Sequence, residues 1–359
     1  MYEYTHGGNV IFEQGKVSTI DLSANINPLG MPMGVKEAIG HEIKNCNRYP
    51  DNFSKELREA IEAFEKVSAD WIFCGNGASD IIFRLPRAVC AKRVLILAPT
   101  FLDYERCARS FGAAVIHYPL SVRDEFVLPD DFVKAIQEQK PDLIFLCNPN
   151  NPTGRLIKRE QIEEILHCCS EGQAQLVVDE CFLDFVEDAE DYTGKVFLEK
   201  HSHLIIIKAF TKLFALPGIR LGYALSSNRA LLNSLYFHGA DWAVSNLAQR
   251  AGIAALKNAD EYIERTKVYV TTERKQLEER LTQLGFYVFN GDANFVFFRS
   301  QFEIDLFQEM DKRGIRIRSC KNYCGLDHTY YRIGVSIEEN NAKVVVAMAE
   351  AIHGIPSET

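Results

Sequence analysis

The chain has 359 residues, which is more than one hydrophobic core usually organises and therefore predicts two domains. Apolar residues make up 47% of it, enough for a large buried core, and the formal net charge is −9 with no long basic run. This charge argues against nucleic acid or an anionic membrane as a partner, so local arginines would have to bind any anionic ligand.

The ten cysteines are scattered and include no Cys-x-x-Cys pair. Cys320 and Cys324 lie four apart, but no second ligand pair completes a zinc site, so we expect free thiols in a reducing cytoplasm and no metal. The first six residues are polar and acidic, unlike a signal peptide. No apolar run approaches the ~18 residues of a membrane span.

Short apolar runs alternate with amphipathic stretches through the middle of the chain. Runs that suit strands buried on both faces occur at 71–74, 94–97, 114–117, 143–146, 176–178 and 204–207. Amphipathic stretches such as 129–139 and 158–169 lie between them and are typical of helices. This alternation predicts an α/β fold with a mostly parallel sheet covered by helices.

The pattern changes near residues 245–260. We expect one long charged helix at about 258–284, ended by Gly285. A smaller α+β unit should follow, with strands at 287–298, 315–318 and 330–335 and helices at 303–313 and 341–352. The prediction is therefore an N-terminal segment packing on the small unit (1–40), a large domain (41–250) and a small C-terminal domain (251–359).

A glycine-rich segment, Gly75-Asn-Gly77-Ala78-Ser79, follows a predicted strand and opens a helix. Glycine lets backbone N–H groups come close to a ligand, and a helix N-terminus attracts negative charge, so the segment suits a phosphate. An ordinary strand-to-helix turn would fit the same residues.

Two further motifs follow predicted strands, at the edge where open α/β sheets bind ligands. Phe101, in Pro99-Thr-Phe101, would stack on a flat ring or belong to the core. Asn151, in Asn148-Pro-Asn-Asn151-Pro-Thr-Gly154, would donate to a phenolate oxygen or cap a sharp turn.

Asp179 and Lys212 carry the strongest chemical signal. Asp179 ends the apolar run Gln-Leu-Val-Val-Asp, where a carboxylate needs a partner such as a protonated ring nitrogen or an arginine. Lys212 follows another apolar run, and its neighbours Thr211 and Arg220 suit a phosphate; a solvated surface lysine is the alternative. A pyridoxal phosphate enzyme needs such a lysine to hold the cofactor as a Schiff base and such a carboxylate to keep the pyridine nitrogen protonated.

The order of these motifs resembles that of the class I/II aminotransferases, which are fold type I pyridoxal phosphate enzymes, over nearly the whole chain. The resemblance implies a large domain with a seven-stranded sheet between helices and a smaller C-terminal domain. It assigns Lys212 to the Schiff base, Asp179 to the pyridine nitrogen, Asn151 to the 3′ oxygen and Phe101 to ring stacking. The residues that it assigns to the cofactor phosphate are Gly77, Ala78, Ser79, Thr211 and Arg220, together with Tyr49 from the neighbouring subunit of a homodimer with shared sites.

Two branches of this family are similar to the chain. Histidinol-phosphate aminotransferases usually read Asp-Glu-Ala-Tyr where this chain has Asp179-Glu-Cys-Phe182. Phe182 would fill the tyrosine's space in the cofactor site, but it cannot donate a hydrogen bond to the cofactor.

Threonine-phosphate decarboxylases are similar in the segment His6-Gly-Gly-Asn9, in Ser-Ala-Asn25, and in the stretch from Arg318 to Arg332. This similarity implies that the substrate contacts are His6, Gly7, Asn25, Asn151, Arg318 and Arg332. Two planar guanidinium groups also suit a substrate with a carboxylate and a phosphate. The chain departs from the family in reading Ile-Gly-Val-Ser-Ile after Arg332, where those enzymes often carry another arginine.

The function that this resemblance implies is pyridoxal phosphate-dependent decarboxylation of O-phospho-L-threonine to (R)-1-aminopropan-2-yl phosphate for cobalamin biosynthesis. O-phospho-L-serine, giving ethanolamine phosphate, is an additional or alternative substrate, because one methyl group changes binding by only about 1–3 kcal/mol. The alternative function is a histidinol-phosphate or aromatic amino acid aminotransferase. A non-catalytic cofactor-binding regulator would need a DNA-binding domain, for which the sequence offers no basic helix.

Overall fold

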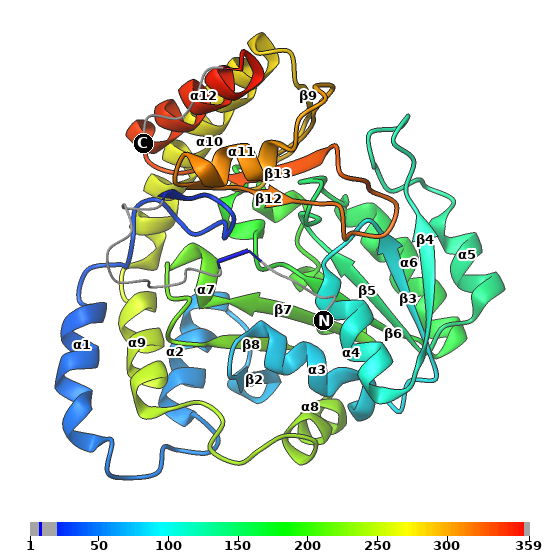
Figure 1. Ribbon diagram of the computed structural model, residues 1–359. Helices are drawn as coiled ribbons and strands as arrows, with labels where there is room; N and C mark the ends of the chain where they lie inside the picture. The colour runs from blue at the N-terminus through cyan, green and yellow to red at the C-terminus, as the bar shows by residue number, and fades with distance from the viewer. Residues whose placement is uncertain (1–6, 9–19, 355–359) are drawn as a thin grey trace.

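The computed structural model describes residues 7–8 and 20–354. Its architecture is α/β: a large sheet lies between two layers of helices, and a smaller unit with its own sheet lies beside it (Figure 1). The predicted fold class is thus confirmed. Within the described residues, none of the helices combines the length and the apolar character that a membrane-spanning segment needs.

The large sheet contains seven strands within the described part of the chain. In spatial order they are β2 (Ile72–Gly75), β8 (Gly222–Leu225), β7 (Leu204–Ala209), β6 (Gln175–Asp179), β5 (Leu143–Cys147), β3 (Arg93–Ala98) and β4 (Ala114–Pro119). β8 pairs antiparallel with β2 and β7, and the other four pairs are parallel. The sheet is therefore mostly parallel, as predicted, although the short strand β8 was not foreseen.

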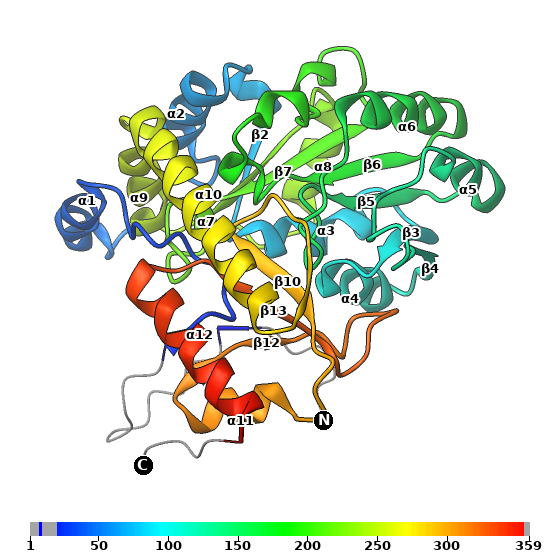
Figure 2. The same cartoon turned by 90° about the horizontal axis from the view of Figure 1, so that it is seen from above.

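Successive residues of these strands face opposite helix layers, because side chains alternate across a sheet. One face packs against α2 (Lys55–Glu65), α5 (Phe132–Gln139), α6 (Arg159–Gly172) and α9 (Asn246–Leu256). The other face packs against α3 (Ala78–Ala88), α4 (Leu102–Phe111) and α8 (Arg229–Phe237). Figure 2 shows α2, α5 and α6 on one side of the sheet, with α3 and α4 on the other. Burial on both faces explains why these strands are continuous apolar runs.

The smaller unit follows the long helix α10 (Ala259–Gln283), whose C-terminal end is marked by Gly285 with a left-handed φ of 91°. Its four-stranded antiparallel sheet has the order β12 (Arg318–Ser319), β13 (Tyr330–Gly334), β10 (Phe295–Arg299) and β9 (Tyr287–Phe289). The helices α11 (Leu306–Lys312) and α12 (Glu338–Ile352) pack with α10 and this sheet around a separate apolar core.

Two predictions for the small unit were wrong in detail. The expected strand 287–298 is a hairpin, because the polar stretch Asn290-Gly291-Asp292 separates β9 from β10. The expected strand 315–318 is split between two sheets, since β11 (Ile315–Arg316) pairs with β1 (Ile20–Asp21) and β12 pairs with β13.

The described part of the N-terminal segment contacts both units. β1 pairs in parallel with β11, and Leu22 belongs to the apolar core of the small unit. The helix α1 (Val35–Glu42) packs against α9 instead. The exact domain limits stay a prediction.

Candidate active site

A cavity of about 530 Å³ opens where the strands of the large sheet end. Its walls come from these strand ends, from the N-terminal segment and from the small unit. The predicted site residues that line it are Gly7, Asn25, Ala78, Ser79, Phe101, Asn151, Asp179, Phe182, Thr211, Lys212, Arg220, Arg318 and Arg332. Residues more than 300 positions apart in sequence thus meet at the edge where open α/β sheets bind ligands.

Three predicted residues are not among the described residues that line the cavity. Gly77 lies next to the cavity, where a Cβ atom would come within 2.6 Å of the Nη2 of Arg220. Tyr49 is away from the cavity, 79% exposed, and stacks on Trp242 with a centroid distance of 4.5 Å. His6 lies outside the described residues.

Lys212 belongs to the short helix α7 (Phe210–Leu213), directly after β7. Its Nζ donates to the backbone oxygen of Ala24 at 2.7 Å and lies 5.9 Å from the centroid of the Phe182 ring. Burial lowers the pKa of Lys212 to about 8, and the nearby charges of Arg332 and Arg220 act in the same direction. An amine of this pKa has a substantial neutral fraction near pH 8, which suits a nucleophile for an aldehyde.

Asp179 ends β6 and is buried, with 4% of its surface exposed. Burial raises the pKa of its carboxyl group, while hydrogen bonds from Cys181 and Tyr104 act in the opposite direction. The Oδ1 atom accepts the backbone N–H of Cys181 at 3.1 Å, and Oδ2 accepts the hydroxyl of Tyr104 at 2.7 Å. Each oxygen retains a further lone pair, so the carboxylate can still accept a ring N–H.

Asn151, which follows β5, and the two arginines of the small unit form another wall of the cavity. The Oδ1 of Asn151 accepts a hydrogen bond from Nη1 of Arg332 and lies 3.4 Å from the hydroxyl of Tyr323. The donor that Asn151 can offer a ligand is therefore its Nδ2 group. Arg332 also donates from Nη2 to the backbone oxygen of Ser23 at 2.7 Å, and Arg318 donates from Nη2 to Asn322 Oδ1 at 2.7 Å.

Buried polar atoms in this wall lack a partner among the described residues. They include Nε of Arg332 and Oδ1 of Asn25. These two residues are only 4% and 3% exposed, so solvent does not replace the missing partners. Burial also lowers the pKa of Arg332, and the charge of Arg318 adds to this effect. An unpartnered guanidinium N–H in a cavity indicates a site for an anionic ligand.

The first turn of α3, where the sequence predicts a phosphate cradle, borders the cavity. No side chain of the described chain caps this helix at Gly77, so its first N–H groups face the cavity edge at Ala78 and Ser79. A Cβ atom at Gly222 would come within 2.6 Å of the Ala78 nitrogen, which shows how closely β8 approaches this turn. Helix N–H groups, a threonine hydroxyl and the guanidinium of Arg220 together fit a phosphate monoester.

The residues present therefore fit the predicted cofactor. A phosphate cradle, a buried carboxylate, an amide donor, a flat aromatic ring at Phe101 and an amine of lowered pKa line one cavity. Within residues 7–8 and 20–354, no group of three or more His, Cys, Asp or Glu side chains is arranged to bind a metal ion.

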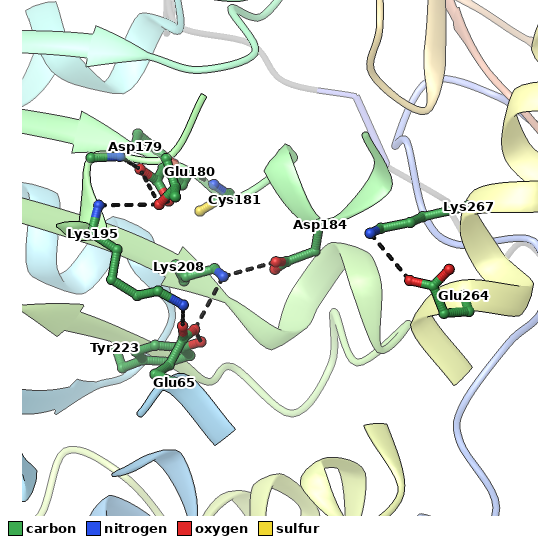
Figure 3. Close-up of polar contacts among 12 residues, drawn as sticks. Glu65, Asp179, Glu180, Cys181, Asp184, Lys195, Lys208, Tyr223, Glu264 and Lys267 are labelled. Carbon is green, nitrogen blue, oxygen red and sulfur yellow. Dashed lines mark hydrogen bonds and ion pairs between the residues drawn. The ribbon is translucent and has the colours of Figure 1, made fainter. Parts of the chain in front are cut away.

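A largely buried ionic network, defined by Glu65, Asp184, Lys195, Lys208 and Tyr223, lies on the face of the large sheet that packs against α2 (Figure 3). Lys208 of β7 faces the α2 side of the sheet, and its Nζ lies 2.8 Å from Oδ1 of Asp184. Glu65 of α2 also accepts from Lys195 at 3.1 Å and from the hydroxyl of Tyr223. The network connects α2, β7, β8 and the segments that follow β6, on the face of the sheet away from the cavity.

Glu180 lies beside this network, one residue after Asp179. Its carboxylate accepts the backbone N–H of Gly194 at 2.8 Å and the hydroxyl of Thr193 at 2.9 Å. Burial raises the pKa of Glu180 to about 7, although the charge of Lys208 favours ionisation.

Several residues of the site were not predicted. Tyr104, Asp103 and Tyr323 were missed, although Asp103 and Tyr323 line the cavity. Asp103 and Tyr104 lie on the amphipathic helix α4, which begins just after Phe101. A single aromatic or acidic residue in such a helix does not by itself indicate a functional role. Tyr323 lies within the stretch from Arg318 to Arg332 that carried the resemblance, so only its individual role was unforeseen.

Comparison with known proteins gives a consistent result. The family model of class I and II aminotransferases matches residues 17–348. Threonine-phosphate decarboxylase of Salmonella typhimurium is 33% identical over 99% of this chain and 98% of its own length. The adenosylcobalamin biosynthesis bifunctional protein of Leptospira interrogans is 30% identical over 97% of this chain, which spans 41% of that protein. The solved structure of histidinol-phosphate aminotransferase from Clostridium acetobutylicum is 32% identical, with a TM-score of 0.86 over 93% of this chain and 99% of that one.

Proposed function

The chain belongs to the class I and II aminotransferase family, and within this family we propose that it decarboxylates O-phospho-L-threonine. The product is (R)-1-aminopropan-2-yl phosphate, and the related substrate O-phospho-L-serine would give ethanolamine phosphate. The single observation that carries the choice of substrate is the pair of buried arginines, Arg318 and Arg332, in a cavity that also holds Lys212 and Asp179. The similarity to the Salmonella typhimurium enzyme over nearly the whole chain supports it.

Pyridoxal phosphate is the cofactor of this family, and when bound it accepts the electron pair of the bond that breaks at the substrate's α-carbon. Lys212 would hold its aldehyde carbon, and Asp179 would accept a hydrogen bond from its ring nitrogen. Asn151 would donate to the ring oxygen, and Phe101 would pack against the ring face. The groups for its phosphate are the first turn of α3 with Gly77, Ala78 and Ser79, together with Thr211 and Arg220.

Arg318 and Arg332 lie directly opposite each other on the paired strands β12 and β13, and their guanidinium groups make different contacts, which fits a substrate with two anionic ends. Arg332 is on the inner wall with Asn151, whereas Arg318 also lines a second cavity of about 710 Å³ that adjoins the first at Gly7, Gly8 and Ser23. A planar guanidinium group binds either a carboxylate or a phosphate through paired N–H groups. Asn25 and Gly7 line the same cavity as the two arginines, and the predicted contact of His6 lies outside the described residues.

Loss of CO₂ leaves an electron pair at the α-carbon that a proton must neutralise. Lys212 is the amine in the cavity, and its lowered pKa of about 8 lets Nζ release and regain a proton near neutral pH. Phe182 is buried against Phe295 with a centroid distance of 5.4 Å. It keeps water from this side of the cavity but offers no hydroxyl group to the cofactor's ring oxygen.

Transamination of histidinol phosphate or an aromatic amino acid is the second candidate. The similarity to the Clostridium acetobutylicum structure supports it, because the same lysine and carboxylate would serve both reactions. A transaminase would convert the cofactor to its amine form when mixed with the amino donor alone. A decarboxylase would instead leave the aldehyde form in place after each turnover.

Substitution of each arginine tests the substrate proposal. Arg318→Gln and Arg332→Gln should each lower kcat/KM for phosphothreonine by about 30-fold or more, equivalent to ~2 kcal/mol of lost charge pairing. Arg299→Gln is the matched control, because Arg299 is an exposed arginine on β10, beside Tyr330 of β13. Equal kcat/KM values in all three variants would contradict the assignment of the arginines.

We also propose a homodimer in which Tyr49 contacts the cofactor phosphate of the neighbouring subunit. Tyr49 is exposed and outside its own chain's cavity, and the apolar side chains of Met33, Ile43 and Phe53 nearby in sequence are exposed as well. Lys212→Ala and Tyr49→Ala proteins, each inactive alone, should regain activity when mixed and refolded together, because one hybrid site is intact. No recovery in the mixture, with a monomeric mass in solution, would overturn the shared site.

A further inference from the structure

Tyr104 on α4 joins two of the residues that line the cavity. Its hydroxyl donates to Oδ2 of Asp179 at 2.7 Å. Its ring and that of Phe101 are roughly perpendicular, with a centroid distance of 5.5 Å and an interplanar angle of 79°. Its own ring stacks on Phe145 of β5 at 4.8 Å with an angle of 6°, and the side chain is fully buried. Tyr104 therefore has a fixed position and does not itself line the cavity.

We propose that Tyr104 is a positioning residue of the cofactor site. Its hydroxyl holds the carboxylate of Asp179 in the orientation that the cofactor ring nitrogen needs, and its ring supports Phe101. This inference rests on the cofactor assigned under the proposed function, but it is independent of whether the reaction is decarboxylation or transamination.

Packing alone does not explain why this residue is a tyrosine, because a phenylalanine ring would make the same apolar contacts. The ring of Tyr104 contacts Phe145 and Phe101, and the surrounding core on this face of the sheet is apolar. In such a core an added hydroxyl is unfavourable unless it has a partner, and Asp179 is that partner. The presence of the hydroxyl therefore indicates that the carboxylate of Asp179 needs this hydrogen-bond donor.

Electrostatics explain this requirement. Burial raises the pKa of Asp179, whereas the cofactor's protonated ring nitrogen needs the ionised carboxylate. The hydrogen bond from Tyr104 favours the ionised form. Burial, together with the charge of Asp179, raises the pKa of Tyr104 well above its usual value, so the hydroxyl remains a donor. The titratable groups that face Asp179 are Tyr104 of α4, Cys147 of β5, Cys181 after β6 and Lys212 of α7.

The test is cofactor affinity of the full-length apoprotein. Tyr104→Phe should weaken binding of pyridoxal phosphate about tenfold, because a hydrogen bond to a charged group is lost. Tyr223→Phe is the matched control: Tyr223 is also a buried tyrosine whose hydroxyl donates to a buried carboxylate, that of Glu65, but it lies on the opposite face of the sheet. The Tyr223→Phe variant should bind pyridoxal phosphate with the same affinity as the unaltered protein.

Two readouts separate positioning from a loss of stability. Affinity falls as the pH drops through the pKa of Asp179, and in Tyr104→Phe this fall should occur at higher pH because the ionised carboxylate has lost a donor. In addition, Tyr104→Phe should add almost nothing to the loss of affinity caused by Asp179→Asn, since Tyr104 acts through Asp179.

The proposal is overturned if Tyr104→Phe binds the cofactor as the unaltered protein does, or if its effect adds fully to that of Asp179→Asn. It is also overturned if Tyr104→Phe and Tyr223→Phe lower the melting temperature of the apoprotein and the cofactor affinity to the same extent. Absence of cofactor binding by the unaltered protein would instead contradict the proposed function.

Discussion

The ammonium group of Lys208 lies 3.1 Å from the Oε1 atom of Glu65, on the side of the large sheet that faces away from the cavity. Both side chains are buried, at 8% and 2% exposure. Burial disfavours the ionised form of each, but the opposite charges dominate: the pKa of Glu65 is lowered to about 2 and that of Lys208 is raised. Lys208 is part of β7, the strand that directly precedes the short helix of Lys212, so this pair links α2 to that strand.

Removing one member of this pair should destabilise the protein strongly. Lys208→Met leaves the buried carboxylate of Glu65 and the partly buried carboxylate of Asp184 without their main counter-charge, at a cost of about 3–5 kcal/mol in the free energy of unfolding. Chemical denaturation of the apoprotein measures this loss. Lys267→Met is the control from Figure 3, because Glu264, the partner of Lys267, is 71% exposed, and such pairs contribute about 0–1 kcal/mol. Similar losses in both variants would contradict the role of the network.

Glu180 should give the apoprotein a measurable pH dependence. Its folded-state pKa of about 7 is above its ordinary value of 4.5, so the unfolded chain releases this proton first as the pH rises. Stability should therefore fall between about pH 4.5 and 7, by ~1.4 kcal/mol for each unit of pKa difference. Glu180→Gln retains an oxygen for the Gly194 N–H and removes the titration. Denaturation midpoints should show a shallower slope in the variant; parallel curves would count against this ionisation.

Lys212 should control the rate of covalent cofactor attachment. The neutral amine attacks the aldehyde, and its pKa of about 8 is below the ordinary value of 10.5. The attachment rate should rise with pH up to about 8 and then level off, as followed by absorbance after mixing apoprotein with pyridoxal phosphate. Lys212→Ala should show no such absorbance change. A rate that continues to rise beyond pH 9 would show that the lysine is not perturbed.

Phe182→Tyr tests the difference from the histidinol-phosphate aminotransferase pattern. Phe182 lines the cavity, so in the apoprotein a hydroxyl on its ring would face the open cavity and should change the stability by only about 0.5 kcal/mol. Bound cofactor would provide a partner, and the stabilisation on adding cofactor should therefore be larger in the variant. Melting temperatures with and without cofactor measure this, and an unchanged difference would place Phe182 away from the cofactor's ring oxygen.

The sequence predicted the fold class and most strands because both faces of the large sheet are buried, which produces unbroken apolar runs. It missed β8, since a four-residue strand that begins with Gly222 gives no such run. It also joined β9 to β10, because apolar residues lie on both sides of the Asn290-Gly291 turn.

Part of the cavity lining followed from motifs at strand ends, and Gly7, Asn25, Arg318 and Arg332 followed from the family resemblance. The supporting residues followed from neither. Glu65, Tyr104 and Lys208 lie within amphipathic or apolar stretches and meet their partners only through tertiary packing. Tyr104, for example, is 75 positions from Asp179 in sequence. No local pattern marks a hydrogen bond between two elements that are so far apart.

The fate of the substrate's carboxyl carbon tests the central claim most directly. O-phospho-L-threonine labelled with ¹³C in the carboxyl group is incubated in D₂O with the protein and pyridoxal phosphate, without any keto acid. We predict that the label appears as CO₂ and that the amine product carries one deuteron at its former α-carbon, delivered through Lys212. Retention of the label in a keto acid, with conversion of the cofactor to its amine form, would contradict decarboxylation and identify the protein as a transaminase.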